Sequence, residues 1–267
     1  MGRLADLAWP EPVGKAVVNL YCRAYDVELD ECRKTSGFAS FDEFFTRELR
    51  DGARPQPEDR SVVISPADGR VDSLGVLDGR SFVVKGRPYR VEELLGDDEE
   101  AKHFDGGLGC VVYLSPRDYH RVHSPVGGVV THIRSMPGDY YPVNEIGVKH
   151  FENLFVRNRR VAIMIDTPDL GRVAVVMVAA MVVGRITVSG IDARDVPFGT
   201  HRPENLDVAR GDEIGIFRLG STAVLFFEKR AGLHFTAGEG PIRFGAPLAQ
   251  REKTKRENGN NGTRSHG

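Results

Sequence analysis

The chain has 267 residues, of which 40% are hydrophobic and 28% are charged, and its formal net charge is −2. This composition supports a buried core and excludes the strongly basic character of most nucleic-acid-binding proteins. The cysteines Cys22, Cys32 and Cys110 have neither CxxC nor zinc-finger spacing, which is typical of free thiols in a reducing compartment. The longest apolar run, residues 173–183, is too short for a membrane-spanning helix and is predicted to be a buried strand or a strand pair.

The first 60 residues have helical periodicity. One segment repeats apolar residues at i, i+4, i+7 and i+11, and these residues are Val13, Val17, Leu20 and Ala24. The opposite face carries Lys15, Asn19 and Arg23. Two interpretations follow, a helix packed on the core and a helix lying on a membrane surface.

The segment "SFDEFFTRELR" predicts a second helix. Ser40 and Glu43 have the spacing of a capping box, which satisfies backbone N–H groups at a helix start. The apolar residues that follow form one stripe, namely Phe41, Phe44, Phe45 and Leu49. We expect this stripe to face the core.

From Ser61 onward, short apolar runs alternate with Gly, Pro and Asp, which is typical of antiparallel strands joined by turns. Residues 91–104 predict one short acidic helix within this part. The sequence therefore predicts an α+β fold, with a β-rich body of mainly antiparallel strands. We expect an N-terminal helical region (1–60), the β-rich body (61–248) and a disordered polar tail (249–267).

The stretch "IGIFRLGSTAVLFFEK", residues 214–229, reads as a buried strand interrupted by Gly220 and Ser221. A glycine inside a strand often marks a β-bulge with a polar residue on its outer side. A serine can also be a nucleophile when a histidine and an aspartate assist it, and His123 and Asp68 are candidates. No G-x-S-x-G elbow surrounds Ser221, and a serine within a strand is poorly exposed to an external substrate. The nearest carbonyl is that of Gly220, in the same backbone.

Two further motifs contain candidate residues. Asp68 lies in "SPADGRV", where an Asp-Gly turn would also explain it. His120 and His123 lie in "YLSPRDYHRVHSPVGG", three residues apart, but no further ligands with supporting spacing accompany them, so we predict no metal site. In an extended segment the two side chains would point to opposite faces, which predicts different roles for them.

These motifs, together with "MPGDYYPVN", "NLFVRNRRV" and "FRLGSTAVLFF", occur in the order seen in the phosphatidylserine decarboxylase family. The chain resembles the pyruvoyl-dependent, bacterial single-chain proenzymes of that family, from about Phe41 to Leu248. "FDEFFTRELR" is similar to the F-x-x-F-F-x-R-x-L element near the start of those proteins.

The resemblance implies an enzyme that makes its own cofactor. Ser221 would attack the Gly220 carbonyl, and elimination and hydrolysis would leave a covalent pyruvoyl group on residue 221. His123 would be the base, oriented by Asp68. The pyruvoyl carbonyl would form a Schiff base with phosphatidylserine, whose loss of CO2 would yield phosphatidylethanolamine. His120 would handle a proton during decarboxylation, and Thr222 would help to hold the new terminus.

Such a substrate implies peripheral attachment to the cytoplasmic side of the cell membrane. The basic cluster Arg157, Arg159 and Arg160 would either meet anionic headgroups or form a solvated turn. The long and short chains of the cleaved precursor are expected to stay associated, and a homo-oligomer is compatible with the family; no nucleic-acid partner is expected.

Three alternatives stay open from the sequence. The first is a Ser-His-Asp hydrolase acting on a lipid or other ester, and the second is a non-catalytic lipid-binding module. The third keeps the family chemistry with another amine substrate.

Overall fold

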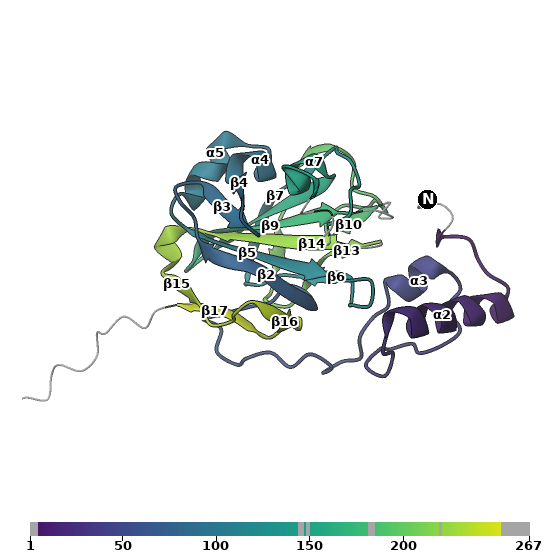
Figure 1. Ribbon diagram of the computed structural model, residues 1–267. Coiled ribbons are helices and arrows are strands. Elements are labelled where there is room, and N and C mark those ends of the chain that lie inside the picture. Colours follow the sequence, from purple (N-terminus) through teal and green to yellow (C-terminus); the bar gives the residue numbers. More distant parts are fainter. Residues whose placement is uncertain (1–4, 144–146, 148–149, 181–184, 219–220, 252–267) are drawn as a thin grey trace, which may run out of the picture.

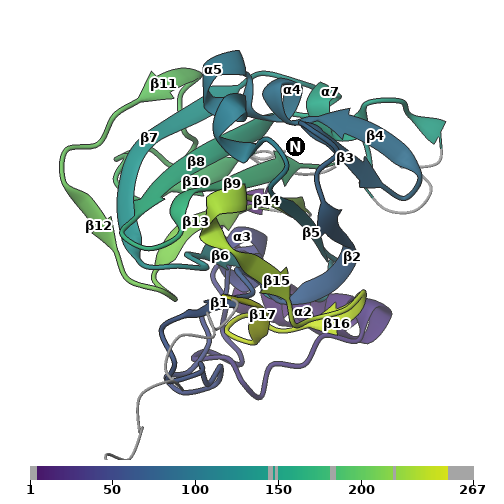
Figure 2. The same ribbon diagram turned by 90° about the vertical axis from the view of Figure 1, so that its left-hand side faces the viewer.

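The computed structural model describes residues 5–143, 147, 150–180, 185–218 and 221–251 (Figures 1 and 2). Antiparallel strands dominate and helices are few, which confirms the predicted α+β class. The helices are α2 (Glu11–Tyr25), α3 (Phe41–Phe45), α4 (Val91–Leu95), α5 (Asp98–Ala101) and α7 (Leu154–Arg157), with 3-10 turns η1 (Lys102–Phe104) and η2 (Lys229–Ala231).

The strands divide among four sheets within the described residues. The largest sheet contains β11 (Gly199–His201), β7 (Gly128–Met136), β8 (Arg160–Thr167), β9 (Gly171–Ala179), β14 (Ser221–Phe227), β5 (Leu108–Leu114), β2 (Gly69–Val76) and β16 (Gly240–Ile242) in this spatial order, and β12 (Leu206–Val208) also pairs with β7. The smaller sheets contain β10 (Ile186–Val188), β13 (Glu213–Phe217) and β6 (Arg121–His123); β1 (Val62–Ile64), β17 (Pro247–Arg251) and β15 (Leu233–Phe235); and the hairpin β3 (Ser81–Val84) with β4 (Arg87–Arg90).

The central strands of the large sheet are buried on both faces. All seven residues of β14 are buried, and this strand pairs with β9 on one side and β5 on the other. Such burial explains the uninterrupted apolar sequence of both β9 and β14, since neither has a solvent face. Figure 2 shows the large sheet curving around the core.

The interrupted strand expected at residues 214–227 is two strands. β13 pairs with β10 and β6, whereas β14 belongs to the large sheet. The prediction of a single strand with an interruption was therefore wrong, because an apolar run along the chain cannot show a change of sheet. Both strands still contribute to one hydrophobic core, to which Ile214, Phe217 and Phe226 belong.

Helix α2 turns the predicted apolar stripe outward. Its buried positions are Gly14 and Val18, and Val18 packs in a small cluster with Phe38 and Phe44. Leu20 is 70% exposed, and Val13 and Val17 are also exposed. The stripe of Val13, Val17, Leu20 and Ala24 therefore does not face the core, and the interpretation as a core-packed face was wrong.

Helix α3 begins as predicted, at a capping box. The Glu43 N–H donates to Ser40 Oγ (3.2 Å), and Glu43 Oε2 accepts from the Ala39 N–H (2.5 Å). The helix ends at Phe45, so Leu49 lies beyond it and bridges to Cys32 instead of extending the stripe. Phe44 and Phe45 are buried.

Two boundaries differ from the sequence prediction. Residues 91–104 form α4, α5 and η1 rather than one helix, because Gly96 adopts a left-handed conformation and Asp97 caps a new helix. Strand β17 continues to Arg251, so the tail cannot begin at residue 249; residues 252–267 lie outside the described residues. No described helix is both long and apolar enough to cross a membrane.

Candidate active site

Ser221 is the first residue of β14, a central strand of the large sheet. Figure 1 shows β14 between β9 and β5. Ser221 pairs with Leu114 of β5 and Ala179 of β9 and is only 1% exposed. Its Oγ has no hydrogen-bond partner among the described residues, and the same holds for Thr222 Oγ1. A buried hydroxyl without a partner is costly, so two adjacent ones mark an unusual site. Gly220, the other residue of the expected cleavage site, lies outside the described residues.

The segment Ser115–His120 connects this point to the first histidine. Ser115 follows the partner of Ser221, and its N–H and Oγ both donate to Asp118 Oδ2 (2.7 Å each). The backbone N–H of Phe217 donates to the His120 carbonyl (2.9 Å). His120 is thus bound to the strand that immediately precedes residues 218–220.

His120 is fully buried and has a defined tautomer. Its Nδ1 lies 2.8 Å from the Asp118 carbonyl oxygen, which can only accept, so Nδ1 carries the proton. Its Nε2 is then a lone pair, buried and without a partner among the described residues. The ring packs on Phe45, with centroids 4.1 Å apart. Burial, with the Arg47 charge as a smaller cause, lowers the pKa of His120 to about 3, which keeps the imidazole neutral.

His123 is held by groups that the sequence did not indicate. Its Nδ1 donates to the Gly211 carbonyl (2.8 Å), and its Nε2 accepts from the Tyr119 hydroxyl (3.0 Å). The ring stacks on Phe244 at 3.7 Å between centroids and 13° between planes. Burial lowers the pKa of His123 to about 4, and the backbone hydrogen bond to Gly211 opposes this shift only in part. His123 is therefore neutral at physiological pH.

Asp68 lies two residues after Pro66, whose carbonyl accepts from the His123 N–H (2.8 Å). Its carboxylate accepts from Arg54 Nε (3.0 Å) and Nη2 (2.6 Å), and from the backbone N–H of Phe244 (2.8 Å). Direct orientation of His123 by Asp68 is not what the structure has, because Gly211 and Tyr119 occupy both ring nitrogens. Phe244 joins the two residues instead, since its N–H binds Asp68 and its ring stacks on His123.

Gly69 explains how Asp68 comes so close to the start of β14. A Cβ atom at Gly69 would lie 2.2 Å from the Tyr113 carbonyl oxygen, so only glycine permits this approach of β2 to β5. Tyr113 pairs in turn with Thr222, next to Ser221. Asp68 directly precedes β2 and Ser221 begins β14, so both lie at the end of the large sheet where β5 finishes. The chain that follows β5 carries His120 in a loop and His123 in β6 of another sheet, and Ser221 Oγ forms no hydrogen bond with Asp68 or with either histidine.

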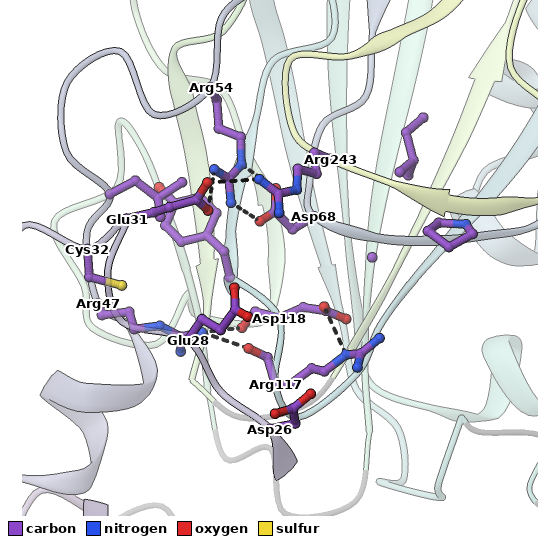
Figure 3. Close-up of a pocket in the computed structure, with 15 residues that line it drawn as sticks. Asp26, Glu28, Glu31, Cys32, Arg47, Arg54, Asp68, Arg117, Asp118 and Arg243 are labelled. Atoms are coloured by element: carbon purple, nitrogen blue, oxygen red, sulfur yellow. Dashed lines mark hydrogen bonds and ion pairs between the residues drawn. The ribbon is translucent and has the colours of Figure 1, made fainter. Parts of the chain in front are cut away.

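A cavity of about 510 Å³ opens beside Asp68 (Figure 3). Asp68, Asp118 and Tyr119 contribute to its wall, together with Arg47 and Arg54. Figure 3 shows Arg54 between Glu31 and Asp68. Burial alone would lower the pKa of Arg54, but its pairing with these two carboxylates raises that pKa. Arg54 therefore stays charged and holds the Asp68 side chain in place in the wall of the cavity.

The basic cluster expected at a surface is mostly internal. Arg159 is 2% exposed, pairing with Asp195 and donating to the Val196 carbonyl. Arg160 is also buried and donates to several main-chain carbonyls, including those of Leu94 and Glu93. For Arg159 and Arg160, neither the headgroup contact nor the solvated turn is correct, because these guanidinium groups donate to carbonyls of the protein interior. Arg157, the third member of the cluster, is exposed.

Sequence reasoning missed Arg54, Gly211 and Phe244, which come from three distant parts of the chain. No spacing rule connects them to the histidines, and only the folded topology brings them there. Tyr119 was within reach of the sequence, since it lies inside the histidine motif.

The candidate site thus comprises a buried serine without a hydrogen-bond partner among the described residues, two neutral histidines and a carboxylate held by Arg54. These are the kinds of group that proton transfer at a hydroxyl requires. Comparison of the chain with known proteins identifies its family. The phosphatidylserine decarboxylase family model matches residues 41–250. The phosphatidylserine decarboxylase proenzyme of Myxococcus xanthus (strain DK1622) is 40% identical over 240 residues, covering 86% of this chain and 84% of that protein. That of Anaeromyxobacter sp. (strain K) is 39% identical over 258 residues, covering 93% of this chain and 91% of that protein. The chain belongs to the phosphatidylserine decarboxylase family.

Proposed function

We propose that this chain is a phosphatidylserine decarboxylase proenzyme that cleaves itself between Gly220 and Ser221. The observation that carries the proposal is the Ser221 hydroxyl, which is buried at the start of a central strand and has no partner among the described residues. An external ester would have little access to it, so nothing favours a hydrolase. The carbonyl carbon of Gly220, in contrast, is bonded to the nitrogen of Ser221 and therefore always lies near the Ser221 hydroxyl.

Self-cleavage follows from the chain's own groups. Ser221 Oγ attacks the Gly220 carbonyl carbon and its proton passes to neutral His123. His123 returns the proton to the nitrogen of residue 221 as the C–N bond breaks, which leaves an ester between Gly220 and the residue 221 oxygen. The Tyr119 hydroxyl donates a hydrogen bond to His123 Nε2, the nitrogen that would accept this proton. The hydroxyl must therefore relay the proton to the imidazole or rotate away from it. Loss of the α-proton of residue 221 then expels Gly220 as a carboxylate. Hydrolysis of the remaining unsaturated residue consumes one water, releases one ammonia and leaves a pyruvoyl group.

The surroundings of Ser221 fit such a group. Thr222 Oγ1 and His120 Nε2 are also buried and have no hydrogen-bond partner among the described residues. The pyruvoyl group supplies a carbonyl that binds the amine of phosphatidylserine and accepts the electrons released with CO2. Neutral His120 has a free lone pair on Nε2, which can accept a hydrogen bond from the substrate ammonium and handle a proton during decarboxylation. Thr222 has a hydroxyl available to hold the new terminus.

Peripheral attachment to a membrane surface is part of the same proposal. The exposed face of α2 carries Val13, Val17 and Leu20, while the other side of this helix packs on α3. Such a face suits insertion at the headgroup boundary. Because the contact is apolar and Arg159 and Arg160 are internal, attachment should depend weakly on salt, unlike an electrostatic contact.

The proposal is tested by measuring CO2 release from phosphatidylserine vesicles. Wild-type protein should release CO2 and form phosphatidylethanolamine, and borohydride treatment should abolish this activity by reducing the carbonyl. Ser221→Ala should be inactive. Vesicles of a lipid that carries a different amino-acid headgroup, with its own amine and carboxylate, distinguish the headgroup. CO2 release by Ser221→Ala at the wild-type rate would refute the proposal.

A further inference from the structure

The N-terminal region clasps the loop that bears His120. Each contact joins a residue from α2 or the end of α3 to the segment 116–121. The contacts are Tyr21 Oη to the Pro116 carbonyl (3.1 Å), Arg47 Nη2 to the carbonyls of Arg117 (2.7 Å) and Asp118 (3.2 Å), and Arg121 Nε to the Thr46 carbonyl (2.9 Å). The loop is therefore positioned by residues far away in the sequence.

Arg47 is the central residue of this clasp. It is 6% exposed, and its guanidinium carbon lies 5.7 Å from the centre of the Phe44 ring. Its Nε and Nη1 have no partner among the described residues, so Arg47 makes its hydrogen bonds through Nη2. A buried, incompletely paired guanidinium does not stabilise a fold efficiently, which suggests that its position serves another purpose.

The Asp118 carbonyl connects Arg47 with His120. This oxygen has two lone pairs and accepts from both Arg47 Nη2 and His120 Nδ1. The second bond places the His120 proton on Nδ1 and leaves Nε2 as the nitrogen that can accept a proton. If the carbonyl turned away, the imidazole would lose this bond and could adopt the other tautomer.

We propose that Arg47 is a positioning residue for His120, because it fixes the Asp118 carbonyl that sets the imidazole tautomer. This inference rests on the proposed role of His120 in decarboxylation. It does not involve self-cleavage, which depends on His123 and Ser221. Loss of Arg47 should therefore separate the two activities, whereas a general folding defect would impair both.

The tautomer is measured first, in the uncleaved Ser221→Ala precursor, so that the result does not depend on enzymatic activity. Imidazole ¹⁵N shifts at neutral pH should show His120 protonated on Nδ1. Adding Arg47→Met should give a mixture of tautomers, and adding Arg33→Met should change nothing. Arg33 is the matched control, since it belongs to the same region but pairs at the surface with Glu48 and Asp51. An unchanged His120 tautomer in Arg47→Met would overturn the proposal.

Turnover is measured next, in proteins with Ser221 intact. Arg47→Met should cleave itself to the wild-type extent, with kcat lowered roughly 10- to 100-fold and KM within about twofold, as expected for a misplaced catalytic group. Arg47→Lys keeps the charge and can reach one carbonyl, so it should recover part of the lost kcat. If Arg47→Met does not fold, the kcat of Arg47→Lys tests the proposal in its place. Wild-type kcat in the folded variant would overturn the proposal. A wild-type protein without decarboxylase activity would instead refute the proposed function, while the tautomer measurement would still stand.

Discussion

His123 and Asp68 are coupled through a third residue, Phe244. The backbone N–H of Phe244 holds Asp68, and its ring lies against the imidazole of His123. An aspartate that contacts histidine directly fixes the tautomer through its own oxygen. Here the Gly211 carbonyl does so, and Asp68 acts on the ring through the position of Phe244.

Replacing Phe244 should therefore slow self-cleavage. Phe244→Leu keeps the backbone N–H that binds Asp68 but removes the aromatic surface on which His123 rests. We expect the cleavage rate to fall roughly tenfold, because the imidazole can then turn away from its working orientation. A time course of newly synthesised precursor on denaturing gels measures this rate. Phe235→Leu, at a partly buried phenylalanine of β15, is the control, and equal rates in the two variants would contradict the coupling.

The buried histidines also predict how stability depends on pH. The pKa of His123 is about 4 in the folded protein, below its usual value of about 6.5 in an unfolded chain. Between these values the unfolded chain binds the additional proton, so the free energy of unfolding falls as the pH is lowered from about 6.5 towards 4. The slope for one such histidine approaches about 1.4 kcal/mol per pH unit.

Urea unfolding of the Ser221→Ala precursor at pH 7 and pH 5 measures this effect. The same protein with His123→Gln should lose less stability between the two pH values, because glutamine does not titrate. An identical pH dependence with and without His123 would show that its pKa is not lowered in the folded state.

At the scale of elements, α3 is attached to the body by a buried carboxylate. Asp42 is 6% exposed and pairs with Arg218 and with Arg194 (2.8 Å). Arg218 also donates from Nε to Thr187 Oγ1 (3.0 Å), which connects α3 to β10 just before residues 219–220. The N-terminal region thus holds the chain segment that leads to Ser221.

Asp42→Asn should weaken this attachment. The change leaves Arg218 partly buried with a neutral partner, and we expect a loss of about 1–3 kcal/mol in the free energy of unfolding, together with slower self-cleavage. Asp51→Asn is the control, since Asp51 is fully exposed and such surface pairs contribute about 0–1 kcal/mol. Chemical denaturation and the cleavage time course measure the two effects; equal stability of the two variants would contradict the role of Asp42.

The exposed face of α2 makes a separate prediction about membranes. Leu20→Glu places a charge where we expect contact with lipid and should weaken binding to phosphatidylserine vesicles about tenfold, because burial of a leucine contributes about 1.5–3 kcal/mol. Asn19→Glu adds the same charge at the neighbouring exposed position and should have a smaller effect. Cosedimentation with vesicles measures both, and equal weakening by the two changes would indicate a purely electrostatic contact.

The sequence predicted those elements whose signal is local. The capping box of Ser40 and Glu43, the run of β-branched residues in β9 and the α+β class were all readable from residue type and spacing. The direction in which the apolar stripe of α2 faces could not be predicted. The same spacing of apolar residues occurs in a helix that packs on a core and in a helix that lies on a membrane. The separation of β13 from β14 was also hidden, because sheet membership depends on pairing with strands elsewhere in the chain, β10 and β6 for β13 and β9 and β5 for β14.

Similar limits apply to the site. The histidine motif and Ser221 were identified because unusual residue types gather in short segments. The burial of Arg159 and Arg160 was not foreseen, as basic residues are seldom internal without a partner and the sequence cannot show which carbonyls will receive them. Phe244 carries no local signal at all.

At the scale of the whole molecule, the proposed cleavage falls between two strands that belong to different sheets but to one core. Ile214 and Phe217 of β13 and Phe226 of β14 are members of the same buried cluster. Strand β14 is also paired along its whole length with β5 and β9, both of which precede the cleavage site. The two fragments should therefore stay associated without a covalent link. All three cysteines lie before residue 220, so no disulfide can join them.

The central claim is tested most directly by intact mass spectrometry of the purified protein under denaturing conditions. Wild-type protein should give two species, residues 1–220 with a free carboxylate on Gly220 and residues 221–267 with a pyruvoyl group in place of Ser221. The two should elute together on size exclusion before denaturation, and Ser221→Ala should give one species of full length. A wild-type protein that decarboxylates phosphatidylserine while intact over all 267 residues would contradict this account.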